Sequence, residues 1–320
     1  MTALRVLAVS LCLLAGTAVA DSGEQWLGRM GRALASTSYS GEFICESAGR
    51  SEKLRILHRV RDGRVSERLV SLSGHGRELV RQDDEVVVYL PDQKLAIIDK
   101  QPGRGQLLGV LPDLSGPSSP WYEVREAGRE PALIGPAVVV VVRPADGYRF
   151  GYRIWIDEAS GMPVRSELQD PAGRIIERLR FTSLTVGGEI TDADLEPGFD
   201  RSRLRWVRQA PHGQPAVPAW RAAQVPPGFR LSVSGLQAMA GTRGPVNHLV
   251  FTDGLASVSV FIHAPAPGTA PVVGSGHAGV ASTYSTVIQG HQVTAVGEVP
   301  PDTLRFIATG LKPAGSGRTP

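Results

Sequence analysis

Hydrophobic residues near the start of the chain repeat first with the period of an α-helix and then with that of a β-strand. The spacing i, i+4, i+7, i+8 predicts one helix with a single apolar stripe, formed by Trp26, Met30, Ala33 and Leu34. From Leu54 to Val60 the period becomes two, and Asp62-Gly63 then gives a strong hairpin signal. Further short runs follow at intervals of about ten residues, which indicates an antiparallel meander.

The stretch after the apolar run Val138–Val142 carries an unusual aromatic pattern. Alternation places one set of side chains on a single face of a strand, namely Tyr148, Phe150, Tyr152, Ile154 and Ile156. Such a face is either a plain hydrophobic core or a groove that holds an acyl chain or a peptide. Many strands and one sizeable helix favour a large, curved antiparallel sheet with one covered face.

The last third of the chain predicts a smaller domain. Two hairpins are expected, over His248–Thr252 with Ser257–His263 and over Ala281–Ile288 with His291–Val296. Pro300-Pro301-Asp302-Thr303 is a good helix start, and the apolar residues up to Leu311 follow at helical spacing. The fold class is therefore mainly β (α+β), with a C-terminal helix in the smaller domain.

The first 20 residues match a secretory signal peptide. A short apolar stretch, Val6–Ala15, follows Arg5 and precedes Ala18-Val19-Ala20, the small-x-small pattern of a cleavage site. Cleavage before Asp21 removes Cys12 and leaves Cys45 alone, so no intramolecular disulfide is expected. The simplest reading of Cys45 is a small buried residue on a strand.

Charge divides the chain into domains. Residues 21–200 have a net charge of −5, residues 201–224 carry five arginines and no acid, and residues 225–320 hold only eight charged side chains. We therefore expect a first domain over 21–200, a basic, proline-rich linker over 201–224, a second domain over 225–311 and a flexible tail over 312–320. The low charge of the second domain is typical of a surface that binds a protein partner.

Catalytic signatures are weak. Gly274-Ser275-Gly276-His277-Ala278-Gly279 fits a nucleotide-binding pattern in letters but lacks the strand–helix context. The histidines have no zinc-site spacing, and Asp192-x-Asp194-x-Glu196 lacks the glycine and the distal glutamate of a calcium loop. The sequence thus predicts no catalytic residue, metal or cofactor. We therefore expect a protein that is not an enzyme.

A cluster of arginines near residue 205 has three alternative interpretations. Arg201, Arg203 and Arg205 stand beside Trp206, a mixture that also occurs in proteins that bind nucleic acids. Export argues against nucleic acid. A solvated linker, or a contact with an acidic protein or a lipid headgroup, remains open.

Long motifs along the whole mature chain resemble the MucB/RseB family, periplasmic regulators of envelope-stress sigma factors. The first domain carries Tyr39-Ser40-Gly41-Glu42-Phe43, Glu67-Arg68-Leu69, Tyr89-Leu90-Pro91-Asp92 and the run from Tyr148 to Asp157. The second carries the runs His248–Phe261 and Gly290–Pro300. The resemblance implies a first domain similar to the LolA/LolB lipoprotein carriers, a half-open β-barrel with covering helices.

The resemblance also implies a function. A protein of this kind binds the periplasmic domain of a single-span anti-sigma factor and shields it from proteolysis until a lipid-bearing signal releases it. Acyl chains of lipopolysaccharide or lipoproteins are then expected on Phe43, Tyr148, Phe150, Tyr152, Ile154 and Phe181. Partner contacts are expected at Arg201, Arg203, Arg205, Trp206, His248, Phe251 and Phe261. A plain periplasmic lipid or lipoprotein carrier is the alternative, and the sequence leaves oligomerisation open.

Overall fold

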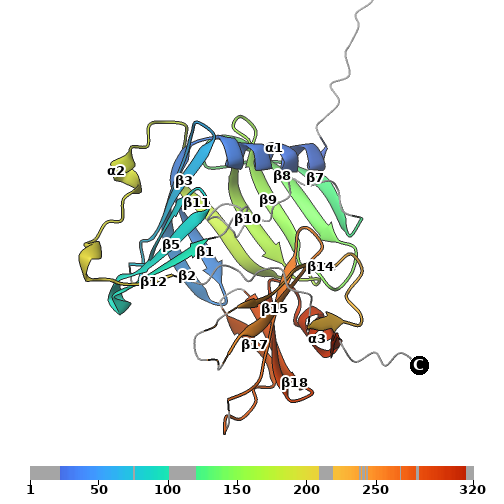
Figure 1. Cartoon of the computed structure of the whole chain (residues 1–320). Helices are drawn as coiled ribbons and strands as arrows, with labels where there is room; N and C mark the ends of the chain where they lie inside the picture. Colours follow the sequence, from blue (N-terminus) through green and yellow to red (C-terminus); the bar gives the residue numbers. More distant parts are fainter. Residues whose placement is uncertain are drawn as a thin grey trace, which may run out of the picture.

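An open sheet of twelve strands dominates the structure (Figure 1). The structure is a computed structural model, and it describes residues 22–74, 76–100, 120–208, 219–237, 239, 242, 244–266, 268–278 and 281–314. The strand order is β12-β6-β5-β4-β3-β2-β1-β11-β10-β9-β8-β7, so the edge strands β12 and β7 do not pair and the curved sheet stays half-open. The large sheet consists of β1 (Tyr39–Ser47), β2 (Arg50–Arg61), β3 (Arg64–Ser71), β4 (Glu78–Gln82), β5 (Glu85–Leu90), β6 (Leu95–Lys100), β7 (Tyr122–Pro131), β8 (Pro136–Pro144), β9 (Gly151–Asp157), β10 (Pro163–Gln169), β11 (Ile175–Val186) and β12 (Arg205–Arg208).

Local turn chemistry sets the register of the hairpins. Asp62 and Gly63 both have positive φ values, 52° and 73°, as a two-residue hairpin turn requires, and they join β2 to β3. The same conformation recurs at Gln289 and Gly290 in the second domain. The predicted meander of short antiparallel strands is confirmed, with β12 as the exception because it pairs in parallel with β6.

Helix α1 (Gly23–Ser36) covers one open end of the sheet (Figure 1). Ser22 caps it, since its side chain accepts from the backbone N–H of Gln25 while the Gln25 side chain accepts from the N–H of Ser22. The predicted stripe of Trp26, Met30, Ala33 and Leu34 is buried on the sheet, and Leu27 is buried beside it. These side chains belong to the first hydrophobic core, together with strands β1, β2 and β8–β11.

The second domain lies at the opposite end of the large sheet from α1 (Figure 1). Its six-stranded sheet has the order β14-β15-β16-β19-β18-β17. The strands are β14 (Arg230–Gln237), β15 (Val246–Thr252), β16 (Ser257–His263), β17 (Gly274–Ala278), β18 (Ala281–Ile288) and β19 (His291–Gly297). Helix α3 (Pro301–Thr309) packs on β18 and β19 through a second core. Both expected hairpins and the C-terminal helix are therefore confirmed.

The expected linker and tail need correction. Residues 205–208 of the segment 201–224 form β12, because Trp206 packs edge-on against Tyr89 with the ring centroids 5.9 Å apart. At its other end β13 (Trp220–Ala222) pairs with β20 (Leu311–Pro313), since Trp220 and Leu311 are buried in the second core. The strand β20 thus includes the first residues of the expected tail over 312–320.

The described residues also include three short helices, η1 (Pro91–Gln93), α2 (Asp192–Leu195) and η2 (Arg201–Arg203). The expected signal peptide, residues 1–20, lies outside the described residues, as do the middle of the linker and the end of the tail. None of the described helices is both long and apolar enough to cross a membrane.

Candidate functional site

Five of the six residues expected in a lipid groove lie in the first core. Phe43 and Phe181 face each other across β1 and β11, with ring centroids 5.4 Å apart. The exposed fraction is 8% or less for Phe43, Phe150, Tyr152, Ile154 and Phe181. The sequence left two interpretations of this face open, a hydrophobic core or a binding groove. In this structure the face forms a closed core, because α1 fills the space above the aromatic side chains.

Tyr148 departs from the expected face. Because β9 begins only at Gly151, the alternation of a strand does not extend back to Tyr148. Its ring packs edge-on against Phe306 of α3, with centroids 5.6 Å apart, and its carbonyl oxygen accepts a hydrogen bond from the Thr303 hydroxyl at 2.9 Å. Tyr148 therefore joins the two domains.

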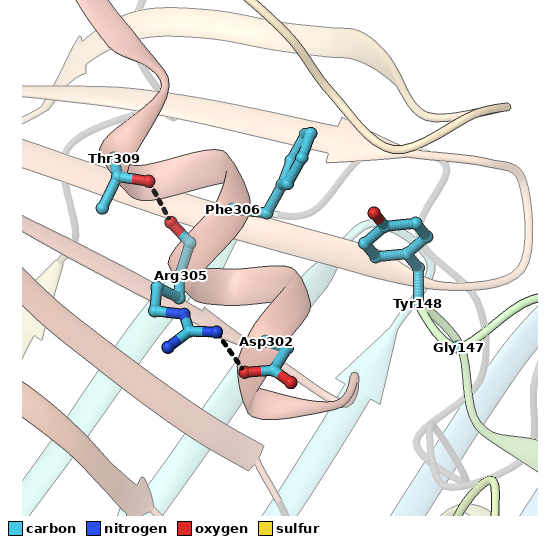
Figure 2. A pocket seen from close by; sticks show the side chains of 6 residues that line it. All are labelled: Gly147, Tyr148, Asp302, Arg305, Phe306 and Thr309. Carbon is cyan, nitrogen blue, oxygen red and sulfur yellow. Dashed lines mark hydrogen bonds and ion pairs between the residues drawn. The ribbon is translucent and has the colours of Figure 1, made fainter.

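A cleft opens beside this contact (Figure 2). It measures about 630 Å³ and is lined by Gly147, Tyr148, Asp302, Arg305, Phe306 and Thr309. Figure 2 shows the Tyr148 and Phe306 rings at one end and the Arg305 guanidinium, paired with Asp302 at 2.9 Å, at the other. Both domains thus contribute to the same apolar and charged surface.

Arg149 and Asp253 form the centre of the contact between the domains, which we call the seam. Their side chains form an ion pair, and neither is exposed to solvent. Arg149 also donates to Asp146 and to the carbonyl oxygen of Pro227, both at 2.5 Å. Asp253 accepts from the Tyr122 hydroxyl at 3.1 Å. Every charge at this centre therefore has a partner, as burial requires.

Aromatic rings surround the Arg149 guanidinium. It lies 5.4 Å from the ring centroid of Trp121 and 4.9 Å from that of Phe229. Gly228 has a φ of +84°, and a Cβ at this position would lie 2.1 Å from Nε1 of Trp121. The seam thus depends on a glycine that allows the second domain to approach this closely.

The seam is the part of the site that the sequence analysis missed. Arg149 lies in the run from Tyr148 to Asp157, which was interpreted only through its aromatic face, and Asp253 lies between the two strands of an expected hairpin. Local periodicity cannot pair two residues that are 104 positions apart. The available signal was a pair of opposite charges, Arg149 and Asp253, one in each domain.

The expected partner-binding residues fall into two separate groups. Arg201, Arg203, Arg205 and Trp206 lie on or next to β12, on the outer edge of the large sheet and apart from the second domain (Figure 1). Trp206 is 46% exposed, and Arg201 pairs with Glu196 at 3.0 Å. This group is thus a surface patch beside the first domain.

The second group occupies opposite faces of the small sheet. Phe251 is buried in the second core, on the side that packs against α3. His248 and Phe261 are cross-strand neighbours on the other face, where their rings stack at 4.6 Å with an angle of 4°. His248 is mostly buried, whereas Phe261 is half-buried. The face of His248 and Phe261 is therefore a better candidate for contact than Phe251.

A cluster of buried polar side chains lies elsewhere, within the large sheet. His58 Nδ1 lies 2.8 Å from Glu67, and its ring stacks on Tyr39 with centroids 4.7 Å apart. All three side chains are fully buried within the large sheet. In the described part of the chain, no group of three or more His, Cys, Asp or Glu residues has the arrangement of a metal site.

Comparisons with known proteins match both domains. A family profile described as MucB/RseB N-terminal domain matches residues 22–199, and one described as MucB/RseB C-terminal domain matches residues 214–312. The chain is 32% identical over 319 residues to the sigma factor AlgU regulatory protein MucB of Pseudomonas aeruginosa, covering 98% of this chain and 97% of that protein. It is 26% identical over 310 residues to the sigma-E factor regulatory protein RseB of Escherichia coli K12, covering 95% and 94%.

Solved structures agree with these relatives. The MucB chain in a complex of Pseudomonas aeruginosa MucA and MucB is similar with a TM-score of 0.72 and 30% identity, covering 92% of this chain and 99% of that one. A second structure, of MucB in complex with MucA(peri), gives a TM-score of 0.71 and 29% identity, covering 92% and 100%.

Proposed function

Because this chain belongs to the MucB/RseB family, we propose that it is a periplasmic sigma-factor regulator that binds the periplasmic domain of a single-span anti-sigma factor. The observation that carries this proposal is the similarity, over 92% of the chain, to a MucB chain in complex with MucA. Both domains are included in that similarity, so the binding function is attributed to the whole two-domain chain.

The second domain is proposed to make the main contact with the anti-sigma factor. Residues 225–320, which comprise this domain and the tail, contain only eight charged side chains, so a partner segment would be held mainly by apolar area and by hydrogen bonds to strand edges. The half-buried Phe261, stacked on His248, supplies an aromatic anchor on the face opposite α3. A segment bound there is covered, and this would shield it from a protease.

The basic patch near β12 is proposed to assist. Arg203 is highly exposed, at 86% of its side chain, and its nearest acidic partner, Asp200, lies 4.0 Å away. Exposed arginines attract acidic stretches of a partner over a distance that salt controls. This patch would therefore add to the rate of encounter more than to the tightness of the complex.

The first domain is proposed to sense lipid along its aromatic face. An acyl chain would have to enter between the sheet and α1, where Trp26, Leu27 and Met30 now pack. Burial of each methylene contributes about 0.8 kcal/mol, so an acyl tail could replace part of this packing without any hydrogen bond. Lipid binding in this way would change how α1 packs on the large sheet.

Release of the anti-sigma factor then follows from linkage. A lipid that binds the released state better than the complexed state shifts the equilibrium by its differential affinity. Tyr148 lies next in sequence to the aromatic face and contacts Phe306 of the second domain, which provides a physical connection between the two sites.

Capture from a solubilised membrane extract of the same organism tests this function against that of a lipid carrier. The tagged protein is expected to retain one single-span anti-sigma factor, identified by mass spectrometry. A spectrum of lipoproteins without the anti-sigma factor would favour the carrier and contradict the proposal. A double variant with Phe261→Ala and His248→Ala serves as the matched control and should retain less of the anti-sigma factor.

A further inference from the structure

The twelve- and six-stranded sheets end in four edge strands, and β14 differs chemically from the other three. An edge strand has backbone N–H and C=O groups that no neighbouring strand pairs, and proteins usually protect such edges by charge, by short length or by bulges. Among the strands that the structure describes, β14 pairs with β15 alone, at one edge of the six-stranded sheet. Its outer side is therefore open to a further strand.

The other three edges carry the usual protection. The edge strand β7 has a bulge and a row of charges, formed by Glu123, Arg125, Glu126, Arg129 and Glu130. The opposite edge of that sheet, β12, has only four residues, and two of them are arginines. The edge strand β17 has five residues with the sequence Gly-Ser-Gly-His-Ala, so it carries no large apolar side chain. These three edges are thus charged or short.

The edge strand β14 combines length with exposed apolar side chains. It is eight residues long, and its single charged residue is Arg230 at the start. Four large hydrophobic side chains in the strand or directly after it are at least 38% exposed, namely Leu231, Val233, Leu236 and Met239. A bulge at Ser232 interrupts the register only near the start and leaves Val233–Gln237 regular. A long apolar edge of this kind is typical of a strand that another chain covers.

The open edge is continuous with the face of His248 and Phe261. Val233 pairs with Val250 of β15, which lies two residues from His248 on the same face of that strand. His248 pairs in turn with Phe261 of β16. Because cross-strand neighbours share a face, a strand added beside β14 would extend the surface that contains this aromatic pair.

The exposed side chains of β14 define the chemistry of the added segment. Leu231 pairs with Phe251, so it lies on the α3 side of the sheet, opposite to Val233. A segment that covers the edge therefore needs apolar side chains on both of its faces. Arg230 is exposed and forms no ion pair with any described residue. An acidic residue of the segment would supply its counter-charge.

The strand β14 begins at the seam. Phe229, the residue before it, is buried, and its ring centroid lies 4.9 Å from the Arg149 guanidinium. Gly228 before that is in close contact with Trp121 of the first domain. A segment bound along β14 would thus start beside the contact between the two domains, where both can touch it.

We propose that β14 is the docking edge for an extended, mainly apolar segment of the anti-sigma factor, which adds to the small sheet as a further strand with an acidic residue near Arg230. This inference rests on the proposed function, because that function supplies the partner. It adds the edge that the partner occupies and the chemistry of the bound segment. Main-chain hydrogen bonds to β14 provide affinity, and alternate side chains on the two faces provide specificity.

Titration calorimetry of the purified protein with the periplasmic anti-sigma domain tests the edge. Val233→Lys combined with Leu236→Lys places two charges on it, and lysine does not repel the acidic residue of the partner. The matched control is Val272→Lys with Val273→Lys, which makes the same change of charge at two more exposed valines of the same domain. The backbone N–H and C=O of Val272 are already bonded to the Gln292 side chain, so an added strand cannot pair with them.

We expect the edge variant to raise the Kd by about tenfold or more, because hot-spot side chains at the centre of an interface have effects of this size. The control variant should stay within about twofold of the wild type. A wild-type Kd in the edge variant, or an equal loss in the control, overturns the inference and leaves the proposed function intact. A folded wild type that does not bind the anti-sigma domain contradicts both.

Hydrogen exchange of the wild type decides the question if the edge variant does not fold. In the free protein the amides of 230–237 that point away from β15 have no partner strand, and in the complex they should exchange at least about tenfold more slowly. The interior strand segment 246–252 is the reference, since both of its neighbours are already paired. Unchanged exchange over 230–237 in a saturated complex overturns the inference.

Discussion

Arg149 of the first domain and Asp253 of the second form an ion pair from which solvent is fully excluded. Asp253 is held in place by its own loop, since its other carboxylate oxygen accepts from the backbone N–H groups of Leu255 and Ala256 at 2.9 and 2.7 Å. Leu255 in turn packs against the core of the first domain. The two domains therefore meet through a rigid, fully paired contact and not only through a linker.

Removal of Asp253 should destabilise the protein strongly. Asp253→Ala leaves the buried Arg149 guanidinium with one fewer counter-charge, and such losses cost about 3–5 kcal/mol. Urea unfolding at pH 7 measures the change. Asp302→Ala is the matched control, because it removes an exposed ion pair with Arg305 and should cost about 1 kcal/mol or less. Equal losses in the two variants would show that the buried pair does not stabilise the seam.

The two phenylalanines of the small sheet should behave differently. Phe251→Ala opens a cavity in the second core and should cost about 3–5 kcal/mol of stability. Phe261→Ala, on the opposite face, should cost less stability and should lower the affinity for the anti-sigma domain at least tenfold. Thermal unfolding and titration calorimetry measure the two effects. Unchanged affinity of Phe261→Ala would move the proposed contact away from this face.

An arginine within the aromatic face should block lipid. Tyr152→Arg places a charge where the wild type buries a ring that is 8% exposed, so an acyl chain could enter only beside a desolvated cation. Displacement of a fluorescent fatty acid should show weaker binding, while affinity for the anti-sigma domain, the measure of correct folding, stays near that of the wild type. A folded variant with normal lipid binding would identify the face as a permanent core.

Salt should distinguish the basic patch from the main contact. Arg203→Glu combined with Arg205→Glu should weaken anti-sigma binding chiefly at low ionic strength, because the Debye length falls from about 30 Å at 0.01 M salt to about 3 Å at 1 M. The matched control combines Arg64→Glu with Arg174→Glu, two arginines with side chains 79% and 83% exposed elsewhere on the first domain. If both pairs weaken binding equally, only net charge matters and the patch is not a specific contact.

Local sequence patterns predicted most of the secondary structure. The stripe from Trp26 to Leu34 became α1, and Asp62-Gly63 formed its turn with both φ values positive, because these signals depend only on neighbouring residues. The large antiparallel sheet and the C-terminal helix were also predicted correctly from these patterns, whereas the half-open form of the sheet was implied by the family resemblance. The same periodicities predict which face of each strand and helix is buried, and the residues of the two hydrophobic cores lie on those faces.

Long-range relationships could not be predicted in this way. Arg205–Arg208 was assigned to a linker because four residues with two arginines carry no strand signal, and its pairing with β6 depends on the Trp206–Tyr89 contact. Whether the aromatic face is core or groove was also undecidable, since both have the same alternation.

The main proposed activity of this chain is binding to the periplasmic domain of its organism's anti-sigma factor. Titration calorimetry of the purified protein with that domain tests the claim most directly. We predict saturable binding with a Kd of about 1 µM or tighter, equivalent to about −8 kcal/mol, and weaker binding after lipopolysaccharide is added. A folded protein that shows no saturable binding to the anti-sigma domain would contradict this proposed activity.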